Sequence, residues 1–208
     1  MTKARLKTKV PKTEWQKLKE ELRMLGWAVL GPLALMWIIE IVDVFVLGGW
    51  LDSFGLRPRE PRGLWGILSS PFLHGGFPHL LSNTVGFLVF GTMLSLRGFR
   101  RFVAASFLIA VVGGLGVWLL GRDGSVHVGA SGVVFGYFGY LLTAGLFERR
   151  IGVAVVSIGV FLLWGWMLLG VLPGQVGVSW EGHLFGFLAG VLAARIFSRE
   201  PLSRILDA

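Results

Sequence analysis

A serine, two histidines and an asparagine in this chain could together carry out acyl transfer. A serine hydroxyl is a poor nucleophile unless a neighbouring imidazole takes its proton, and Ser131 and His183 could form such a pair. Acyl transfer also needs hydrogen-bond donors where the carbonyl oxygen becomes negative. The backbone amide of Ser131 and the side chains of His79 and Asn83 could supply them.

The spacing of these residues is consistent with one shared site. His79 and Asn83 are four residues apart and share one face of a helix, while His74 lies in the preceding loop. Two stripes of glycine, which let membrane helices approach closely, accompany the pair: Gly132, Gly136 and Gly139 after Ser131, and Gly186 and Gly190 after His183.

The elements that must position these residues are long and apolar. The 208 residues are 54% hydrophobic and 15% charged, with a mean hydropathy of +0.70, which is too apolar for a soluble protein of this size. Six long apolar segments lack the alternation of polar and apolar residues that is typical of barrel strands. They therefore predict an all-α integral membrane bundle of six transmembrane helices. The six segments are Gly26 to Gly49, Leu80 to Leu96, Phe102 to Leu120, Ser131 to Phe147, Ile151 to Leu172, and Gly182 to Phe197.

The positive residues predict an orientation. All but four of the 20 Lys and Arg residues fall inside if the amino terminus is cytoplasmic, and both termini are then cytoplasmic. The second, fourth and sixth segments then all begin at the external face, where the polar residues lie. The net charge of +8 follows this topology and does not indicate nucleic-acid binding. The four external residues are Arg57, Arg59, Arg62 and Arg122.

We predict one membrane domain with two polar ends. A basic leader over residues 1–25 precedes the six-helix domain at 26–198, and a short cytoplasmic tail follows at 199–208. Trp15, Leu18 and Leu22 recur at helical spacing, so the leader is either an interfacial helix on anionic lipid or a solvated tail. The chain has no cysteine, which excludes disulfides and thiolate chemistry.

Each polar residue also has a purely structural interpretation. Ser131 could cap a helix, His183 could bond to a loop, and Asn83 could join two helices. We expect Glu181 to be an exposed loop carboxylate and His127 to be structural. A metal site is disfavoured because the histidines lack a matching carboxylate or thiolate set. Glu40 and Asp43, in the outer half of the first segment, are expected to face the bundle or a loop.

Three motifs together resemble the rhomboid intramembrane proteases. They are HxxxxHxxxN from His74 to Asn83, GASG from Gly129 to Gly132, and WEGHLFGFLAG from Trp180 to Gly190. The first loop is also similar to the family in GLRPR from Gly55 to Arg59 and GILSSPFLH from Gly66 to His74.

The resemblance implies a catalytic dyad of Ser131 and His183, with the oxyanion stabilised by His79, Asn83 and Ser131. It implies cleavage of transmembrane protein substrates in or beside their membrane segments, with no metal and no cofactor. We expect the cell membrane of a prokaryote as the location. Phe135 stands where many relatives have Tyr, so a stack on the histidine is retained without the hydroxyl, and Gly66 stands where some relatives place Arg. The supporting residues are His74, Phe135, Gly129, Gly132, Gly186 and Gly190.

Two other functions fit parts of the pattern. A noncatalytic rhomboid-like protein could bind unstable membrane helices without cleaving them, although the presence of both Ser131 and His183 argues against this. A small transporter or channel is suggested only by the buried polar residues. The substrate and the oligomeric state are not predicted. The fifth segment and the loop from Pro173 to Glu181 are the expected moving element.

Overall fold

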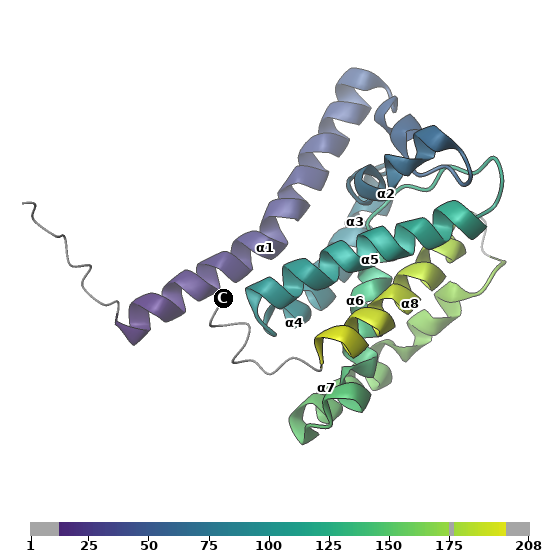
Figure 1. The fold of residues 1–208 in the computed structure, drawn as a ribbon. Helices are drawn as coiled ribbons and strands as arrows, with labels where there is room; N and C mark the ends of the chain where they lie inside the picture. Colours follow the sequence, from purple (N-terminus) through teal and green to yellow (C-terminus); the bar gives the residue numbers. More distant parts are fainter. Residues whose placement is uncertain (1–12, 175–176, 199–208) are drawn as a thin grey trace, which may run out of the picture.

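The computed structural model describes residues 13–174 and 177–198, and these residues form helices joined by loops (Figure 1). No strand occurs among them. The elements of the membrane domain are α1 (Glu14–Val42) with η1 (Asp43–Leu47), α3 (Phe77–Gly86) with η5 (Phe87–Gly91) and α4 (Thr92–Ser95), α5 (Phe99–Leu120), α6 (Ser131–Glu148), α7 (Ile151–Trp164) with η6 (Gly165–Val171), and α8 (Trp180–Phe197). The first loop carries η2 (Leu51–Phe54), η3 (Pro61–Leu64), α2 (Gly66–Ser69) and η4 (Ser70–Phe72).

The first helix begins earlier than the apolar pattern predicts. Thr13 and Gln16 form a reciprocal capping box, with Gln16 N donating to Thr13 Oγ1 at 3.3 Å and Thr13 N to Gln16 Oε1 at 3.0 Å. Residues 14–25, which we assigned to the leader, are therefore the first turns of α1 and not a separate element. Residues 1–12 of the predicted leader and the predicted tail at 199–208 lie outside the described residues.

Four helical stretches are long and apolar enough to cross a membrane: Lys19–Leu47, Phe77–Ser95, Phe99–Leu120 and Ile151–Val171. The remaining two helices, α6 and α8, match the predicted fourth and sixth segments and have 18 residues each. Glycines and polar residues lower their mean hydropathy. The described chain is thus an all-α protein with four candidate membrane spans.

The core is built around α6. This helix packs along α8 and also contacts α5, α7 and the α3–η5 segment, so few of its side chains reach the surface (Figure 1). Tyr137, Phe138 and Tyr140 are among the largest fully buried side chains. The Tyr137 hydroxyl lies 2.8 Å from Ser106 Oγ on α5, which satisfies its polar atom inside the core.

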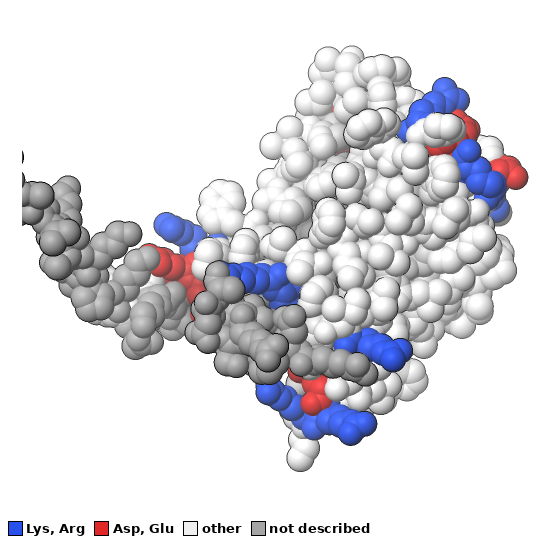
Figure 2. Space-filling view, viewed as in Figure 1, with Lys and Arg blue, Asp and Glu red and all other residues white. Residues whose placement is uncertain are grey.

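Charged side chains gather at the two ends of the helices and leave an uncharged belt between them (Figure 2). Exposed large apolar side chains occupy the outward faces of the helices, including Phe45, Phe107 and Leu162. An apolar belt on the outside of a helical bundle is the surface that lipid chains cover.

Candidate active site

A cavity of about 1070 Å³ opens at the end of the bundle where α3, α6 and α8 begin. Its wall includes the side chains that the sequence singled out on all three helices. The η6 segment and residues of the loop after α5 complete the wall. The predicted residues on it are His79, Asn83, Ser131, Phe135 and His183.

Ser131 is the first residue of α6, and the backbone before it is held by the first loop. Gly129 N donates to Ser70 O at 2.9 Å, and Ala130 N donates to His74 Nε2 at 3.4 Å. Amide groups in the first turn of a helix have no acceptor within that helix. The amide of Ser131 is therefore a donor at the same place as its hydroxyl.

Gly129 has no tolerance for a side chain. Its φ of +106° is a conformation that residues with a Cβ rarely adopt, and an added Cβ would lie 2.5 Å from His79 Cε1. The same Cβ would lie 3.1 Å from Asn83 Nδ2. This close approach brings the side chains of His79 and Asn83 against the backbone that leads into Ser131.

Asn83 carries an unused donor. The residue is buried, and its Nδ2 has no hydrogen-bond partner among the described residues. A buried donor without a partner is costly and rare in folded proteins. Asn83 also lines the cavity, so this buried amide lies in the cavity wall.

His183 has a defined tautomer and a defined ring orientation. Its Nδ1 lies 3.0 Å from the carbonyl oxygen of Gly170, and a carbonyl only accepts, so Nδ1 carries the proton. The lone pair of Nε2 is then free to accept a proton. The imidazole also stacks on Phe135, with ring centroids 4.0 Å apart and an angle of 7° between the planes.

His74 supports this arrangement without lining the cavity. It is buried, and its ring meets that of His79 edge-on, with centroids 5.3 Å apart. Burial, and next the neighbouring His79, lower the pKa of His74 to about 4. A neutral ring is also what the hydrogen bond from Ala130 N to its Nε2 requires.

The glycines of α6 and α8 set the distance between the two helices. A Cβ on Gly186 would lie 2.0 Å from Gly132 O, and one on Gly190 would lie 1.9 Å from Gly136 O. Only hydrogen atoms fit in these contacts, so the two backbones touch. The helices that carry Ser131 and His183 are therefore in direct contact below the cavity.

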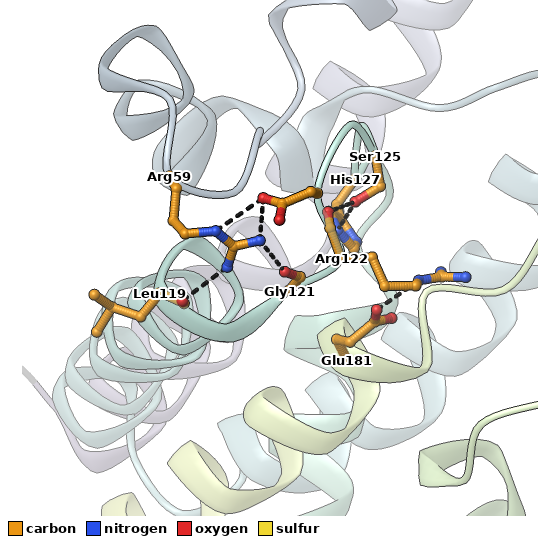
Figure 3. A network of polar contacts seen from close by, with 8 residues as sticks. Arg59, Leu119, Gly121, Arg122, Ser125, His127 and Glu181 are labelled. Carbon is orange, nitrogen blue, oxygen red and sulfur yellow. Dashed lines mark hydrogen bonds and ion pairs between the residues drawn. The ribbon is translucent and has the colours of Figure 1, made fainter.

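The prediction that Glu181 is an exposed loop carboxylate is wrong. Its side chain is in the first turn of α8, is only 1% exposed, and accepts a hydrogen bond of 2.6 Å from Arg122 Nε. His127 is buried, bonds to Ser125 and Ser179, and also lines the cavity (Figure 3). Ser179 is the N-cap of α8, a role that a serine just before an apolar run signals.

Other predicted polar residues lie away from the cavity. Glu40 and Asp43 are buried, as expected, and Asp43 Oδ1 accepts from Leu51 N at 2.9 Å in the first loop. Within the part of the chain that the structure describes, no group of three or more His, Cys, Asp or Glu side chains could hold a metal ion.

The fold and the site define a helical integral membrane protein with a cavity at one end, lined by apolar side chains and by a few polar ones. A family model described as the Rhomboid domain matches residues 61–200. The chain therefore belongs to the rhomboid family, whose members are usually serine proteases.

Relatives come from bacteria and plants. The chain is 43% identical over 181 residues to uncharacterized protein Rv1337 of Mycobacterium tuberculosis, which covers 83% of this chain and 75% of the relative. It is 30% identical over 168 residues to YdcA of Bacillus subtilis, named as a candidate rhomboid protease, covering 79% and 83%. It is 31% identical over 159 residues to RHOMBOID-like protein 5 of Arabidopsis thaliana, covering 73% and 50%.

Proposed function

We propose that this chain is an intramembrane serine endopeptidase that cleaves peptide bonds in or next to transmembrane segments of membrane proteins. One observation supports this most: a single cavity is lined by Ser131, by His183 with its Nδ1 bonded to a carbonyl, and by Asn83, whose buried Nδ2 has no partner in the described part of the chain. A structural role for each residue alone does not account for this convergence.

The proposed reaction uses these groups in sequence. Ser131 Oγ attacks the carbonyl carbon of the scissile bond while its proton moves to His183 Nε2. The negative oxygen that forms is stabilised by the Ser131 amide, by Asn83 Nδ2 and by His79. When the C–N bond breaks, His183 returns the proton to the leaving amine. Water then attacks the acyl carbon with His183 again as base. The bond from this carbon to Ser131 Oγ breaks, His183 returns the proton to Oγ, and the second product leaves as a carboxylic acid.

We also propose that all six long helical segments cross the bilayer, with both termini in the cytoplasm and the cavity at the external end. The excess of Lys and Arg on the opposite side supports this orientation. Helix α6 is surrounded by other helices, and α8 packs on α5 and α6, which lowers the hydropathy that both need to cross. In this arrangement the substrates are membrane proteins in the same bilayer.

The test is the Ser131→Ala variant in proteoliposomes with a fluorogenic transmembrane substrate. We expect cleavage to fall to background and labelling by a fluorophosphonate to disappear, because the attacking oxygen is lost. The thermal unfolding midpoint should stay close to that of the wild type. Cleavage by Ser131→Ala at the wild-type rate would refute the dyad. Capture of the substrate by the wild type without cleavage or labelling would identify a noncatalytic binding protein instead.

A further inference from the structure

The third loop, residues 121–130, connects α5 to α6 and is fastened to the first loop by Arg59 (Figure 3). Arg59 Nη1 donates to Leu119 O at 2.9 Å and Nη2 to Gly121 O at 2.8 Å, and Nε pairs with Asp123 Oδ1 at 2.9 Å. Leu56 and His127 add two backbone hydrogen bonds of 2.9 Å each between the same two loops. The first loop thus bonds to the third loop near its start, at Gly121 and Asp123, and near its end, at His127.

The same loop holds the first turn of α8 at two points. Arg122 Nε bonds to Glu181 Oε1, and His127 Nδ1 lies 2.5 Å from Ser179 Oγ (Figure 3 shows Arg122 and Glu181 facing each other). Glu181 is 1% exposed, whereas the side chain of Arg122 is 58% exposed. The carboxylate is therefore the buried member of the pair, and the arginine that reaches it from the loop is its ion-pair partner.

The hydrogen bonds at the second point can be assigned a direction. The Ser125 hydroxyl donates to Arg122 O at 2.6 Å, so it must accept from His127 Nε2, which lies 2.8 Å away. A neutral His127 then accepts at Nδ1 from the Ser179 hydroxyl, and Ser179 Oγ accepts from Gly182 N at 3.2 Å. Burial lowers the pKa of His127, with Glu181 acting to raise it and Arg122 to lower it, so the neutral form is favoured.

The Arg122–Glu181 and His127–Ser179 contacts connect the two parts of the chain that carry the proposed dyad. The third loop ends at Ser131, and His183 is two residues after Glu181. We propose that Glu181 is a positioning residue: held by Arg122, it keeps the first turn of α8, and so the His183 imidazole, in place relative to Ser131. This inference rests on the proposed function, because the reaction is what requires a fixed distance between the two side chains.

Glu181 acts on the orientation of the base and not on the binding of substrate, because it does not line the cavity. In the full-length protein, Glu181→Gln removes the charge and keeps the size. We expect kcat to fall on the order of tenfold, as a small misplacement of a catalytic group does, with KM within about twofold. The rate of fluorophosphonate labelling at Ser131 should fall in parallel.

The exposed partner provides a second variant if the buried substitution impairs folding. Arg122→Gln should give the same loss of kcat, and Arg122→Lys should recover part of it because a cation is retained. Arg62→Gln is the matched control: Arg62 is an external arginine whose side chain is 78% exposed and pairs only with Glu60 among the described residues. It should have wild-type kcat and KM.

A readout without catalysis separates this inference from the proposed function. Backbone hydrogen exchange at residues 180–184 should be on the order of tenfold faster in Glu181→Gln and Arg122→Gln than in the wild type. If the wild type neither cleaves nor labels, the proposed function fails, while the exchange rates still report on α8. Wild-type exchange in both variants, or wild-type kcat in both, would overturn the positioning role.

Discussion

Contacts with uncharged groups set the tautomer and the ring orientation of His183. A carbonyl of η6 binds Nδ1, and the ring of Phe135 fixes the plane of the imidazole. In triads a carboxylate performs both tasks and also stabilises the imidazolium. Here the stack predicted from the resemblance is present, and the Gly170 carbonyl is a contact that sequence comparison alone does not reveal. A dyad without a carboxylate therefore has a physical basis in this chain.

The buried His74 makes stability depend on pH. Its pKa of about 4 in the folded protein lies below its ordinary value of 6.5, so between these values the unfolded chain binds a proton that the folded chain does not. The contribution of the neutral His74 to the free energy of unfolding is thus fully present above pH 6.5 and is lost as the pH falls toward 4. The full loss is on the order of 3 kcal/mol.

We expect His74→Gln to reduce this dependence, because glutamine accepts from Ala130 N without titrating. Unfolding midpoints, followed by the fluorescence of the nine tryptophans in detergent, should fall less between pH 7 and 4.5 than in the wild type. Identical slopes in the two proteins would contradict the assigned pKa.

At the scale of elements, the contact between α6 and α8 decides whether the site exists. Each of the two glycine pairs brings one backbone against the other, so the starts of both helices reach the same cavity. Three elements then supply the wall: α3 contributes His79 and Asn83, α6 contributes Ser131, and α8 contributes His183. The η6 segment contributes the carbonyl that bonds to His183 Nδ1.

Gly190→Ala should separate the two helices, because the new methyl group would lie 1.9 Å from Gly136 O. Overpacking of this kind costs about 1–3 kcal/mol, and a shift of about 1 Å at the site costs about a hundredfold in rate. We expect a lower unfolding midpoint and a strong loss of kcat. Gly159→Ala on α7 is the control, since its methyl group would meet nothing within 4 Å. Equal effects of the two substitutions would argue against backbone contact as the cause.

At the scale of the whole molecule, the charges on the face drawn in Figure 2 lie at the ends of the helices, and a belt without charged residues lies between them. Not all of the cations at the end opposite the cavity face water. Arg97 and Arg101 both pair with Glu148, and all three side chains are largely buried. This cluster ties the turn before α5 to the end of α6. The remaining positive residues on this side still outnumber those at the external end.

The absence of cysteine allows a direct test of topology with single introduced cysteines. We expect Trp65→Cys and Leu172→Cys to react with an impermeant maleimide from outside the cell. Ile151→Cys and Ala208→Cys should react only after the membrane is opened. All three described positions are exposed, so accessibility to the reagent is set by the bilayer. Labelling of Ile151→Cys from outside would show that α6 does not cross.

Much of the fold could be predicted from local pattern. Apolar runs of sufficient length must be helical in a bilayer, so the predicted segments match the helices α3 to α8 within a few residues. The helix α1 begins at Glu14, before the apolar segment predicted from Gly26, because polar and charged residues extend it, and the helical alternative for the leader allowed for this. The candidate residues of the cavity were also recognisable, because polar side chains at membrane depth are costly and therefore conspicuous.

The sequence by itself thus determined that the protein is helical, lies in the membrane and carries a serine, histidines and an asparagine at the starts of three helices. Only the tertiary structure decided that Glu181 is buried against Arg122, that His183 bonds to Gly170, and that the Asn83 donor has no partner among residues 13–174 and 177–198. Local pattern depends on neighbours in sequence, whereas burial and hydrogen bonding depend on residues that are 13 positions apart for Gly170 and His183 and 59 for Arg122 and Glu181.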